Sequence, residues 1–290
     1  MKLSPWILAA RPKTLPAAIA PVLVGTALAG HDHVFAWQPA LICLAFAVLI
    51  QIGTNFANDY YDFLKGADTE SRIGPTRAVA SGLISAGAMR RATIVVLVLA
   101  FMVGLALVYW GGWQLIIVGV LSIICAVAYT GGPYPLGYNG LGDIFVFVFF
   151  GLIAVGFTYY VQAGSFSSVS WLLGAAVGAL STNLLVVNNY RDLETDRIAG
   201  KRTLVVRLGR NAAWWQYSLS IVFAFGVALF LALGDIGWGL FLPLTMAPLG
   251  LTLPLLLKRS RGSADFQLVL TQTAKLLMFY SGLVSVGLVI

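Results

Sequence analysis

The sequence predicts an all-α protein, a polytopic membrane helical bundle of about nine transmembrane helices. Of its 290 residues, 59% are hydrophobic and only 10% are charged, whereas about 25% of the residues in a soluble domain are charged. The mean hydropathy is +0.89. The apolar residues gather in runs of about 20, the length that crosses a bilayer as a helix. This composition excludes a soluble globular enzyme, a disordered chain and a secreted disulfide scaffold.

Nine apolar segments are long enough to be membrane spans. They cover residues 15–31, 37–59, 90–110, 112–130, 141–162, 171–190, 212–232, 236–256 and 267–289. Cations precede the first segment, as they do in a signal peptide, but the eight further spans favour an uncleaved anchor. We therefore expect residues 1–290 to form a single integral membrane domain.

Lys and Arg divide unevenly between the two sides that these spans define. The net charge of +7 would suggest nucleic-acid binding in a soluble chain, but cytoplasmic loops of membrane proteins are also rich in Lys and Arg. Seventeen of the 18 cations fall on the side of the N-terminus. The remaining one, Lys275, lies inside the ninth span. The pattern predicts a multi-pass protein of the cell membrane, with a cytoplasmic N-terminus, an external C-terminus and no nucleic-acid partner.

Seven of the 11 acidic residues fall in two clusters at the cytoplasmic ends of the second and sixth spans. The first cluster, NFANDYYDFLKGADTE, contains Asn55, Asn58, Asp59, Asp62, Asp68 and Glu70. The second, NNYRDLETDRIAGKR, contains Asn188, Asn189, Asp192, Glu194 and Asp196. Spacings of three and four residues place Asn55, Asn58 and Asp62 on one helix face, and Asn188, Asp192 and Asp196 on another. By the topology of the spans, both clusters are expected to face the cytoplasm.

Two carboxylate-bearing faces near a membrane are costly unless a cation lies between them. Oxygen ligands without His or Cys favour a hard ion, and Mg²⁺ takes one or two carboxylates together with substrate phosphates. Arg and Lys side chains in the same connections suit a Mg²⁺–diphosphate ligand. They are Lys65, Arg72, Arg77, Arg191, Lys201 and Arg202. The simpler interpretations remain open, namely that the acids mark helix ends at the interface and that the cations reflect orientation alone.

At these residues the chain resembles the UbiA superfamily of membrane prenyltransferases, whose two signatures are an Asn/Asp motif after the second span and a DxxxD motif after the sixth. Within it, the sequence is most similar to the branch that prenylates 1,4-dihydroxy-2-naphthoate in menaquinone synthesis. The strings that carry the resemblance lie between about residues 10 and 210. They are ARPKTLPAAIAPVLVGTALA, NFANDYYDFLKGADT, GPTRAVASGLIS, YTGGPYPLGYNGLGD and NNYRDLETDRIAGKRTLVVRLG.

The resemblance implies Mg²⁺-dependent transfer of a polyprenyl chain from its diphosphate to 1,4-dihydroxy-2-naphthoate, with loss of CO₂, to give demethylmenaquinone. It implies two Mg²⁺ ions held by Asp62, Asp192 and Asp196, with help from Asn58, Asp59, Asn188 and Asp68. Asp59 is counted with these three as catalytic. The expected substrate-binding residues are Asn55, Asn58, Arg72, Arg77, Lys65, Tyr129, Tyr134, Asn188, Arg191, Lys201, Arg11 and Lys275.

Further roles are expected for aromatic and acidic side chains. Tyr129, Tyr134, Tyr159 and Tyr160 could form electron-rich walls for an allylic cation, although interfacial anchoring is the favoured explanation of any single tyrosine. Asp143 is a candidate proton acceptor. Arg11 could reach the carboxylate of the acceptor, or could simply mark the cytoplasmic side.

The sequence also departs from the superfamily pattern. The connection after the fourth span has Tyr134 and Tyr138 but no lysine, where some members carry one. Lys275, expected to be buried, is one candidate to replace it. Asp68 follows Asp62 at a spacing of six residues, and this longer loop argues against a hydroxybenzoate acceptor.

Two alternatives remain. The first is the same chemistry with another aromatic acceptor, such as 4-hydroxybenzoate or homogentisate. The second is an ion-coupled transporter, whose carboxylates would be expected near the midplane of the membrane on broken helices. The partners expected on the first interpretation are polyprenyl diphosphate, 1,4-dihydroxy-2-naphthoate and the lipid bilayer, and no oligomeric state is indicated.

Overall fold

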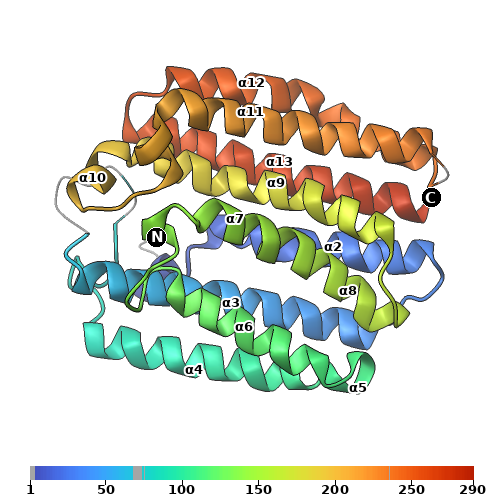
Figure 1. Cartoon of the computed structure of the whole chain (residues 1–290), viewed down its shortest axis with the longest axis horizontal. Coiled ribbons are helices and arrows are strands. Elements are labelled where there is room, and N and C mark those ends of the chain that lie inside the picture. The colour runs from blue at the N-terminus through green and yellow to red at the C-terminus, as the bar shows by residue number, and fades with distance from the viewer. Residues whose placement is uncertain (1–3, 68–73, 75, 235) are drawn as a thin grey trace.

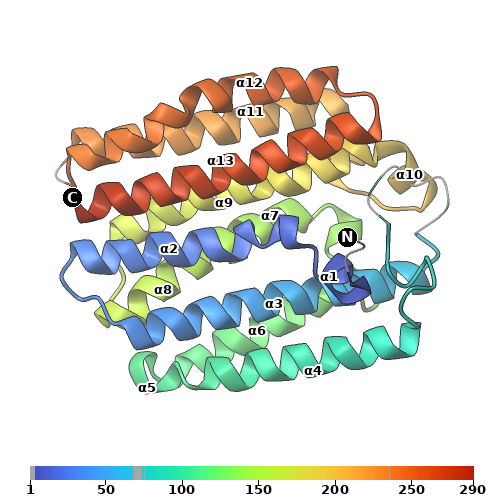
Figure 2. The ribbon, with the colours of Figure 1, turned by 180° about the vertical axis from the view of Figure 1, so that it is seen from behind.

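The computed structural model describes residues 4–67, 74, 76–234 and 236–290, and these residues form helices and connecting turns without a β-strand. Long helices lie side by side in one bundle (Figures 1 and 2). The short helix α10 lies at one end of this bundle and the C-terminus at the other (Figure 1). The predicted fold class, an all-helical membrane bundle, is confirmed.

The first half of the chain contains the helices α1 to α6. They are α1 (Pro5–Ala10), the 3₁₀ turn η1 (Pro12–Thr14), α2 (Pro16–His31), α3 (Trp37–Leu64), α4 (Ala86–Leu105), α5 (Val108–Gly111) and α6 (Gln114–Ala128). The second half contains the remaining elements. They are η2 (Gly137–Asn139), α7 (Gly142–Phe147), the π-helical turn η3 (Val148–Ile153), α8 (Ala154–Ala163), α9 (Ser168–Arg191), α10 (Leu193–Ile198), α11 (Leu204–Leu233), the 3₁₀ segment η4 (Trp238–Met246), α12 (Ala247–Arg259) and α13 (Ser263–Val289).

Seven helices in the described residues are long and apolar enough to cross a membrane. An eighth span results if α1, η1 and α2, which are bent by 49°, count as one. The predicted fourth span is the shorter apolar helix α6, so the predicted count of nine is approximate.

The ends of several predicted spans are wrong. The predicted third span runs to residue 110, but α4 ends at Leu105 and a separate turn of helix, α5, leads to Gly112. The predicted seventh span begins at 212, whereas α11 begins at Leu204 and kinks at Gly209, which has a φ of 83°. Hydropathy detects only the apolar part of a helix, and a helix whose cap lies in water extends beyond it.

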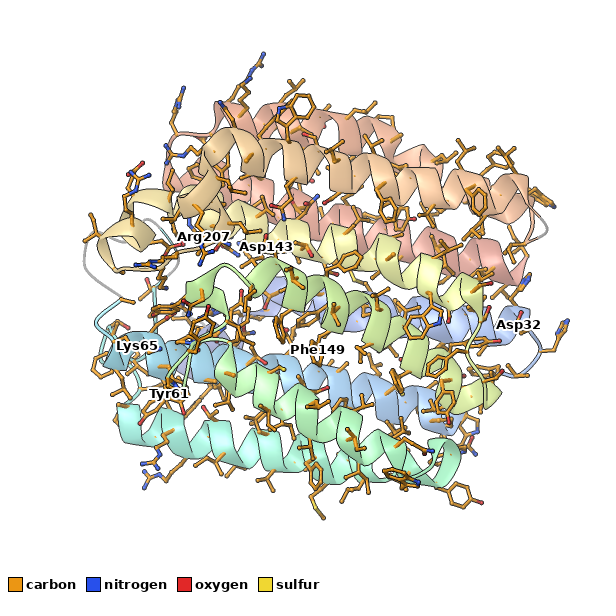
Figure 3. All side chains as sticks on the ribbon, viewed as in Figure 1. Asp32, Tyr61, Lys65, Asp143, Phe149 and Arg207 are labelled. Carbon is orange, nitrogen blue, oxygen red and sulfur yellow. The ribbon has the colours of Figure 1, made fainter. Side chains whose placement is uncertain are left out.

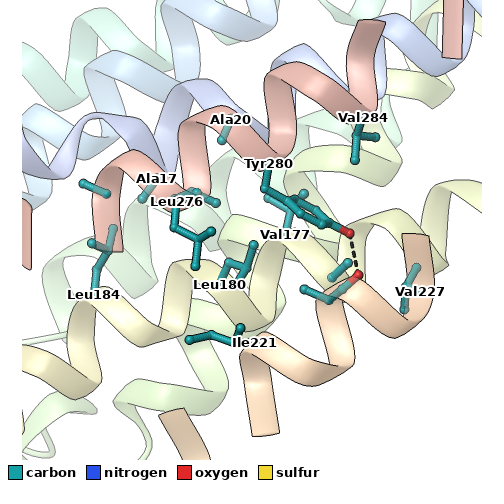
Figure 4. Close-up of a cluster of buried hydrophobic side chains, with 14 of the residues drawn as sticks. Ala17, Ala20, Val177, Leu180, Leu184, Ile221, Val227, Leu276, Tyr280 and Val284 are labelled. Carbon is teal, nitrogen blue, oxygen red and sulfur yellow. Dashed lines mark hydrogen bonds between the residues drawn. The ribbon is translucent and has the colours of Figure 1, made fainter. Parts of the chain in front are cut away.

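The largest core cluster joins α2, α9, α11 and α13 (Figure 4). Two buried tyrosines link α11 to α13 by hydrogen bonds. The Tyr280 hydroxyl donates to the carbonyl of Ala224 at 2.6 Å, and the Tyr217 hydroxyl lies 2.7 Å from the Thr273 hydroxyl. Inside a membrane, apolar surface gains little from leaving lipid, so such bonds and close packing hold the helices together.

Glycines allow α9 to approach η3 closely. A Cβ atom on Gly151 would lie 2.5 Å from Gly178 Cα, and one on Gly178 would lie 2.6 Å from the carbonyl oxygen of Phe147. This contact coincides with the π-helical turn, a feature often found at functional sites. The opposite side of the same turn carries Phe149, which lines the cavity described below.

Candidate active site

One cavity of about 600 Å³ lies among α2, α3, α6, α7, η3 and α9. Its polar end lies where α3 and α9 finish, on the side of Lys65 in Figure 3, and Phe149 lies farther along the bundle. Most predicted site residues line it. They are Arg11, Asn55, Asn58, Asp59, Asp62, Arg77, Tyr129, Asn188, Arg191, Asp192, Asp196 and Lys201. The two acidic motifs, about 130 residues apart in the sequence, therefore face one cavity.

Asp62 is the buried carboxylate of the first motif, with 3% of its side chain exposed. Arg77 Nη2 lies 2.9 Å from Oδ2 in an ion pair. The Tyr138 hydroxyl donates to Oδ1 at 2.7 Å, and Lys201 Nζ lies 3.4 Å from the same oxygen. Three segments of the chain thus meet at this carboxylate.

The second motif is divided by a helix break rather than lying on one continuous helix. Asp192 ends α9, and Asp196 lies in α10. Arg191 Nε and Nη2 each donate to one oxygen of Asp192 at 2.7 Å. Lys201 Nζ lies 3.7 Å from Asp196 as well as 3.4 Å from Asp62, so it connects the two motifs.

Tyr138, noted in the connection after the fourth span, is a site residue to which the sequence assigned no role. The ammonium groups of Lys65 and Lys201 each lie 4.6 Å from the centre of its ring, a cation–π distance. Lys65 also donates to the carbonyl of Thr130 at 2.6 Å. Burial lowers the pKa of Lys65, Asp62 opposes this, and Lys201 lowers it further. No pattern in one sequence distinguishes Tyr138 from Tyr134, which is 59% exposed and does not line the cavity.

Several polar residues of the first motif hold neighbouring segments in place. Both oxygens of Asp59 accept backbone N–H bonds, from Ala78 and Val79, at 3.1 Å. This fixes the segment that carries Arg77. The Asn58 side-chain oxygen accepts from the Thr130 hydroxyl at 2.8 Å, tying α3 to the end of α6.

Other expected site residues lie elsewhere. Lys275 is exposed on α13 and does not line the cavity, so its predicted burial is wrong. Position within a span does not determine which face of the helix carries a residue. Tyr159 and Tyr160 bond to Asp32 and to the Gly111 carbonyl, away from the acidic motifs, so they do not form the expected cavity wall.

Three candidates remain, Asp143, Asp68 and Arg72, and the structure describes only the first. Asp143 is buried and accepts a hydrogen bond from Gln216 at 2.8 Å, but it does not line the cavity. Asp68 and Arg72 lie outside the described residues.

The polar end offers oxygen ligands for a hard cation. Among the described residues, no three His, Cys, Asp or Glu side chains gather into a protein-only metal site. This arrangement fits Mg²⁺, which takes one or two carboxylates and completes its shell with water and substrate phosphates. The carboxylates of Asp62, Asp192 and Asp196 and the cations paired with them match a Mg²⁺–diphosphate ligand in charge.

The cavity is not sealed from its surroundings. Ile7, Lys13 and Ile116 line it and are also exposed on the outside of the protein. Aromatic side chains also line it, among them Phe46, Phe101, Phe149 and Phe157. A ligand with a charged head and a long apolar tail fits this division.

A model of the UbiA prenyltransferase family matches residues 18–283. The 1,4-dihydroxy-2-naphthoate octaprenyltransferase of Mycobacterium tuberculosis is 40% identical over 95% of this chain and 94% of its own. The protein of that name from Escherichia coli is 43% identical over 88% of this chain and 83% of its own.

Solved structures share the fold. A UbiA homolog from Aeropyrum pernix superposes with a TM-score of 0.68 at 15% identity, covering 92% of this chain and 97% of its own. A UbiA homolog from Archaeoglobus fulgidus, bound to DMAPP and Mg²⁺, superposes with a TM-score of 0.63 at 16% identity, covering 98% of this chain and all of its own.

Proposed function

This chain belongs to the UbiA prenyltransferase family, and from that premise we propose that it transfers a polyprenyl chain from polyprenyl diphosphate to 1,4-dihydroxy-2-naphthoate. Diphosphate and CO₂ are released, and the product is demethylmenaquinol, which oxidises to demethylmenaquinone. The observation that carries the proposal is the single cavity in which both acidic motifs meet aromatic walls. The names of the relatives from M. tuberculosis and E. coli support this acceptor.

The reaction breaks the bond between the allylic carbon and a diphosphate oxygen, and it forms a bond from that carbon to the ring. The bond between the ring and its carboxylate also breaks, and its electron pair stays with the ring as CO₂ leaves. Bound Mg²⁺ neutralises diphosphate charge and makes it a better leaving group. We assign two ions to Asp62, Asp192 and Asp196, with Asn58 and Asn188 beside them, and Asp68 remains a predicted ligand outside the described residues. The Mg²⁺ in the Archaeoglobus fulgidus homolog supports use of this metal. Asp59 contributes by holding the segment that carries Arg77.

The cations of the site bind the diphosphate. Arg77, Arg191 and Lys201 lie against the carboxylates, and each can move its hydrogen bonds to phosphate oxygens. Lys65 is held beside them by Tyr138 and takes the place of the lysine missing after the fourth span. Tyr129 lines the same cavity and offers a π face to the allylic carbon as positive charge develops there.

The first test is product formation by purified protein in detergent, with polyprenyl diphosphate, 1,4-dihydroxy-2-naphthoate and Mg²⁺, with and without EDTA. We expect a prenylated, decarboxylated product only when the metal is present. If product forms with another phenolic acid but not with naphthoate, the proposed acceptor is wrong and the prenyl-transfer reaction stands. Folded protein with no product from any acceptor would favour the transporter alternative.

We further propose that the N-terminus and both acidic motifs face the cytoplasm and the C-terminus faces outward. The support is the distribution of cations, 17 of which fall on one side of the predicted spans. Alkaline phosphatase, which is active only outside the cytoplasm, should be active when fused after Ile290 and inactive when fused after Arg261. The reverse result would invert the orientation.

A further inference from the structure

The turn between α1 and α2 has an unusual backbone conformation. Arg11 lies in the left-handed region, with φ 51° and ψ 69°. Residues other than glycine adopt this region uncommonly, and glycine would adopt it without strain. Pro12 follows directly and disfavours a right-handed helical conformation at Arg11. A strained backbone at a residue that lines a cavity points to a role for its side chain.

Buried amides of α3 hold this turn. The Thr14 hydroxyl donates to the Arg11 carbonyl at 3.0 Å and accepts from Gln51 Nε2 at 3.0 Å and Asn55 Nδ2 at 3.1 Å. Asn55 Nδ2 also donates to the Ala10 carbonyl at 2.9 Å. Asn55 is 3% exposed and Gln51 is 7% exposed. The polar groups of these two residues, one helical turn apart, thus fix the backbone on both sides of Arg11.

The turn borders the same cavity as the acidic motifs. Arg11, Thr14, Gln51 and Asn55 all line it. Tyr129, Asp62 and Asp196 line it too, so Arg11 shares one cavity with the carboxylate end. Arg77, Arg191 and Lys201 pair with carboxylates at that end. Arg11 reaches the cavity from a different part of the chain, the turn between α1 and η1.

We propose that the Ala10–Thr14 turn is the subsite for the carboxylate of the aromatic acceptor. Arg11 binds that carboxylate, and Thr14, Gln51 and Asn55 are positioning residues that hold Arg11 in place. The proposal rests on the proposed function for the identity of the acceptor. It gives Asn55 the role of supporting the turn instead of contacting substrate.

The chemistry of the side chain fits this ligand. A guanidinium is planar, always charged and matches the two oxygens of a carboxylate with parallel N–H donors. A site that binds a charged group rejects the analogue that lacks it much more strongly than an apolar pocket rejects a missing methylene. The turn would therefore select an aromatic acid over the corresponding phenol.

The test compares binding of 1-hydroxy-2-naphthoate and 1-naphthol, which differ only in the carboxylate, to purified protein by calorimetry. We expect wild type to prefer the acid by at least about tenfold. R11G should lose this preference while remaining folded, because glycine adopts the left-handed conformation of this position without strain. R259Q removes an exposed cation at the end of α12 and should keep the preference.

Turnover separates binding from positioning. R11G should raise KM for 1,4-dihydroxy-2-naphthoate at least about tenfold and leave KM for polyprenyl diphosphate unchanged within about twofold. N55L should raise the same KM less, and R11G/N55L should be no worse than R11G alone, since Asn55 acts through Arg11. R11K should restore part of the affinity.

The outcomes distinguish this inference from the proposed function. Retention of the acid preference by folded R11G, or no preference in wild type, would overturn the subsite. An additive loss in R11G/N55L would overturn the positioning role of Asn55. If the preference for the aromatic acid depends on Arg11 but the protein makes no product from naphthoate, the subsite stands and the proposed acceptor is wrong.

Discussion

Asp62 receives side chains from three distant parts of the sequence, Arg77, Tyr138 and Lys201. We expect D62N and D192N each to lower turnover by at least about 100-fold, a typical cost of removing one preorganised charged or polar group from a reaction centre. Steady-state kinetics at limiting Mg²⁺ measures this. E194Q is the matched control, because Glu194 is 60% exposed on the surface of α10. Wild-type turnover in a normally inserted D62N would contradict the metal assignment.

Tyr138 combines two roles that substitution can separate. Y138F removes the hydroxyl that donates to Asp62 but keeps the ring between Lys65 and Lys201. We expect it to lower kcat by roughly tenfold, as loss of a hydrogen bond to a charged group would, while Y138A should also raise KM for the diphosphate. Equal kinetics for Y138F and Y138A would show that the ring does not hold the lysines.

At single positions, helical spacing predicted which residues could share a cavity but not what each one contacts. Asn55, Asn58 and Asp62 lie on the predicted side of α3. The bonds of Asp59 to Ala78 and Val79, and those of Asn55 to the Ala10–Thr14 turn, join segments that no periodicity relates. Partners of this kind follow from tertiary packing, which one sequence does not reveal.

Among the elements, α9 lies in close contact with the end of α7 and with η3 beside the cavity. A Cβ on Gly178 would lie 2.6 Å from a backbone oxygen, which cannot give way as a flexible side chain can. We expect G178A to destabilise the protein by about 1–3 kcal/mol, measured by thermal unfolding in detergent. G226A in α11, whose Cβ would meet nothing within 4 Å, should be neutral or slightly stabilising. Equal stability of the two variants would contradict this account.

Helix existence was predicted well because long apolar runs are a strong signal, whereas breaks within helices were not. The π-helical turn η3 lies in the middle of the predicted fifth span, and the break at Asp192 falls inside the predicted second acidic face. Both arise where the backbone adapts to a neighbour or to a turn. Hydropathy does not register either feature.

For the molecule as a whole, ligand binding should be cooperative between metal and anion. The carboxylates are paired with Arg77, Arg191 and Lys201, so Mg²⁺ alone must displace cations, and diphosphate alone must bind beside carboxylates. When both bind, Mg²⁺ and diphosphate neutralise each other's charge. We expect Mg²⁺ with inorganic diphosphate to raise the thermal midpoint by more than the sum of the separate shifts, following mass action. Additive shifts would contradict this, and EDTA should abolish the joint effect.

Because the cavity is open to its surroundings, the concentration of substrate in the membrane determines how much of it the protein binds. A volume of about 600 Å³ suits a ligand of ordinary drug size, so the far part of a long polyprenyl tail must extend past exposed lining residues such as Ile116 into lipid. The bilayer is then both solvent and part of the binding site for that substrate. The rate should follow the mole fraction of polyprenyl diphosphate in the membrane rather than its bulk molarity. Adding inert lipid at constant total substrate should therefore slow turnover by surface dilution.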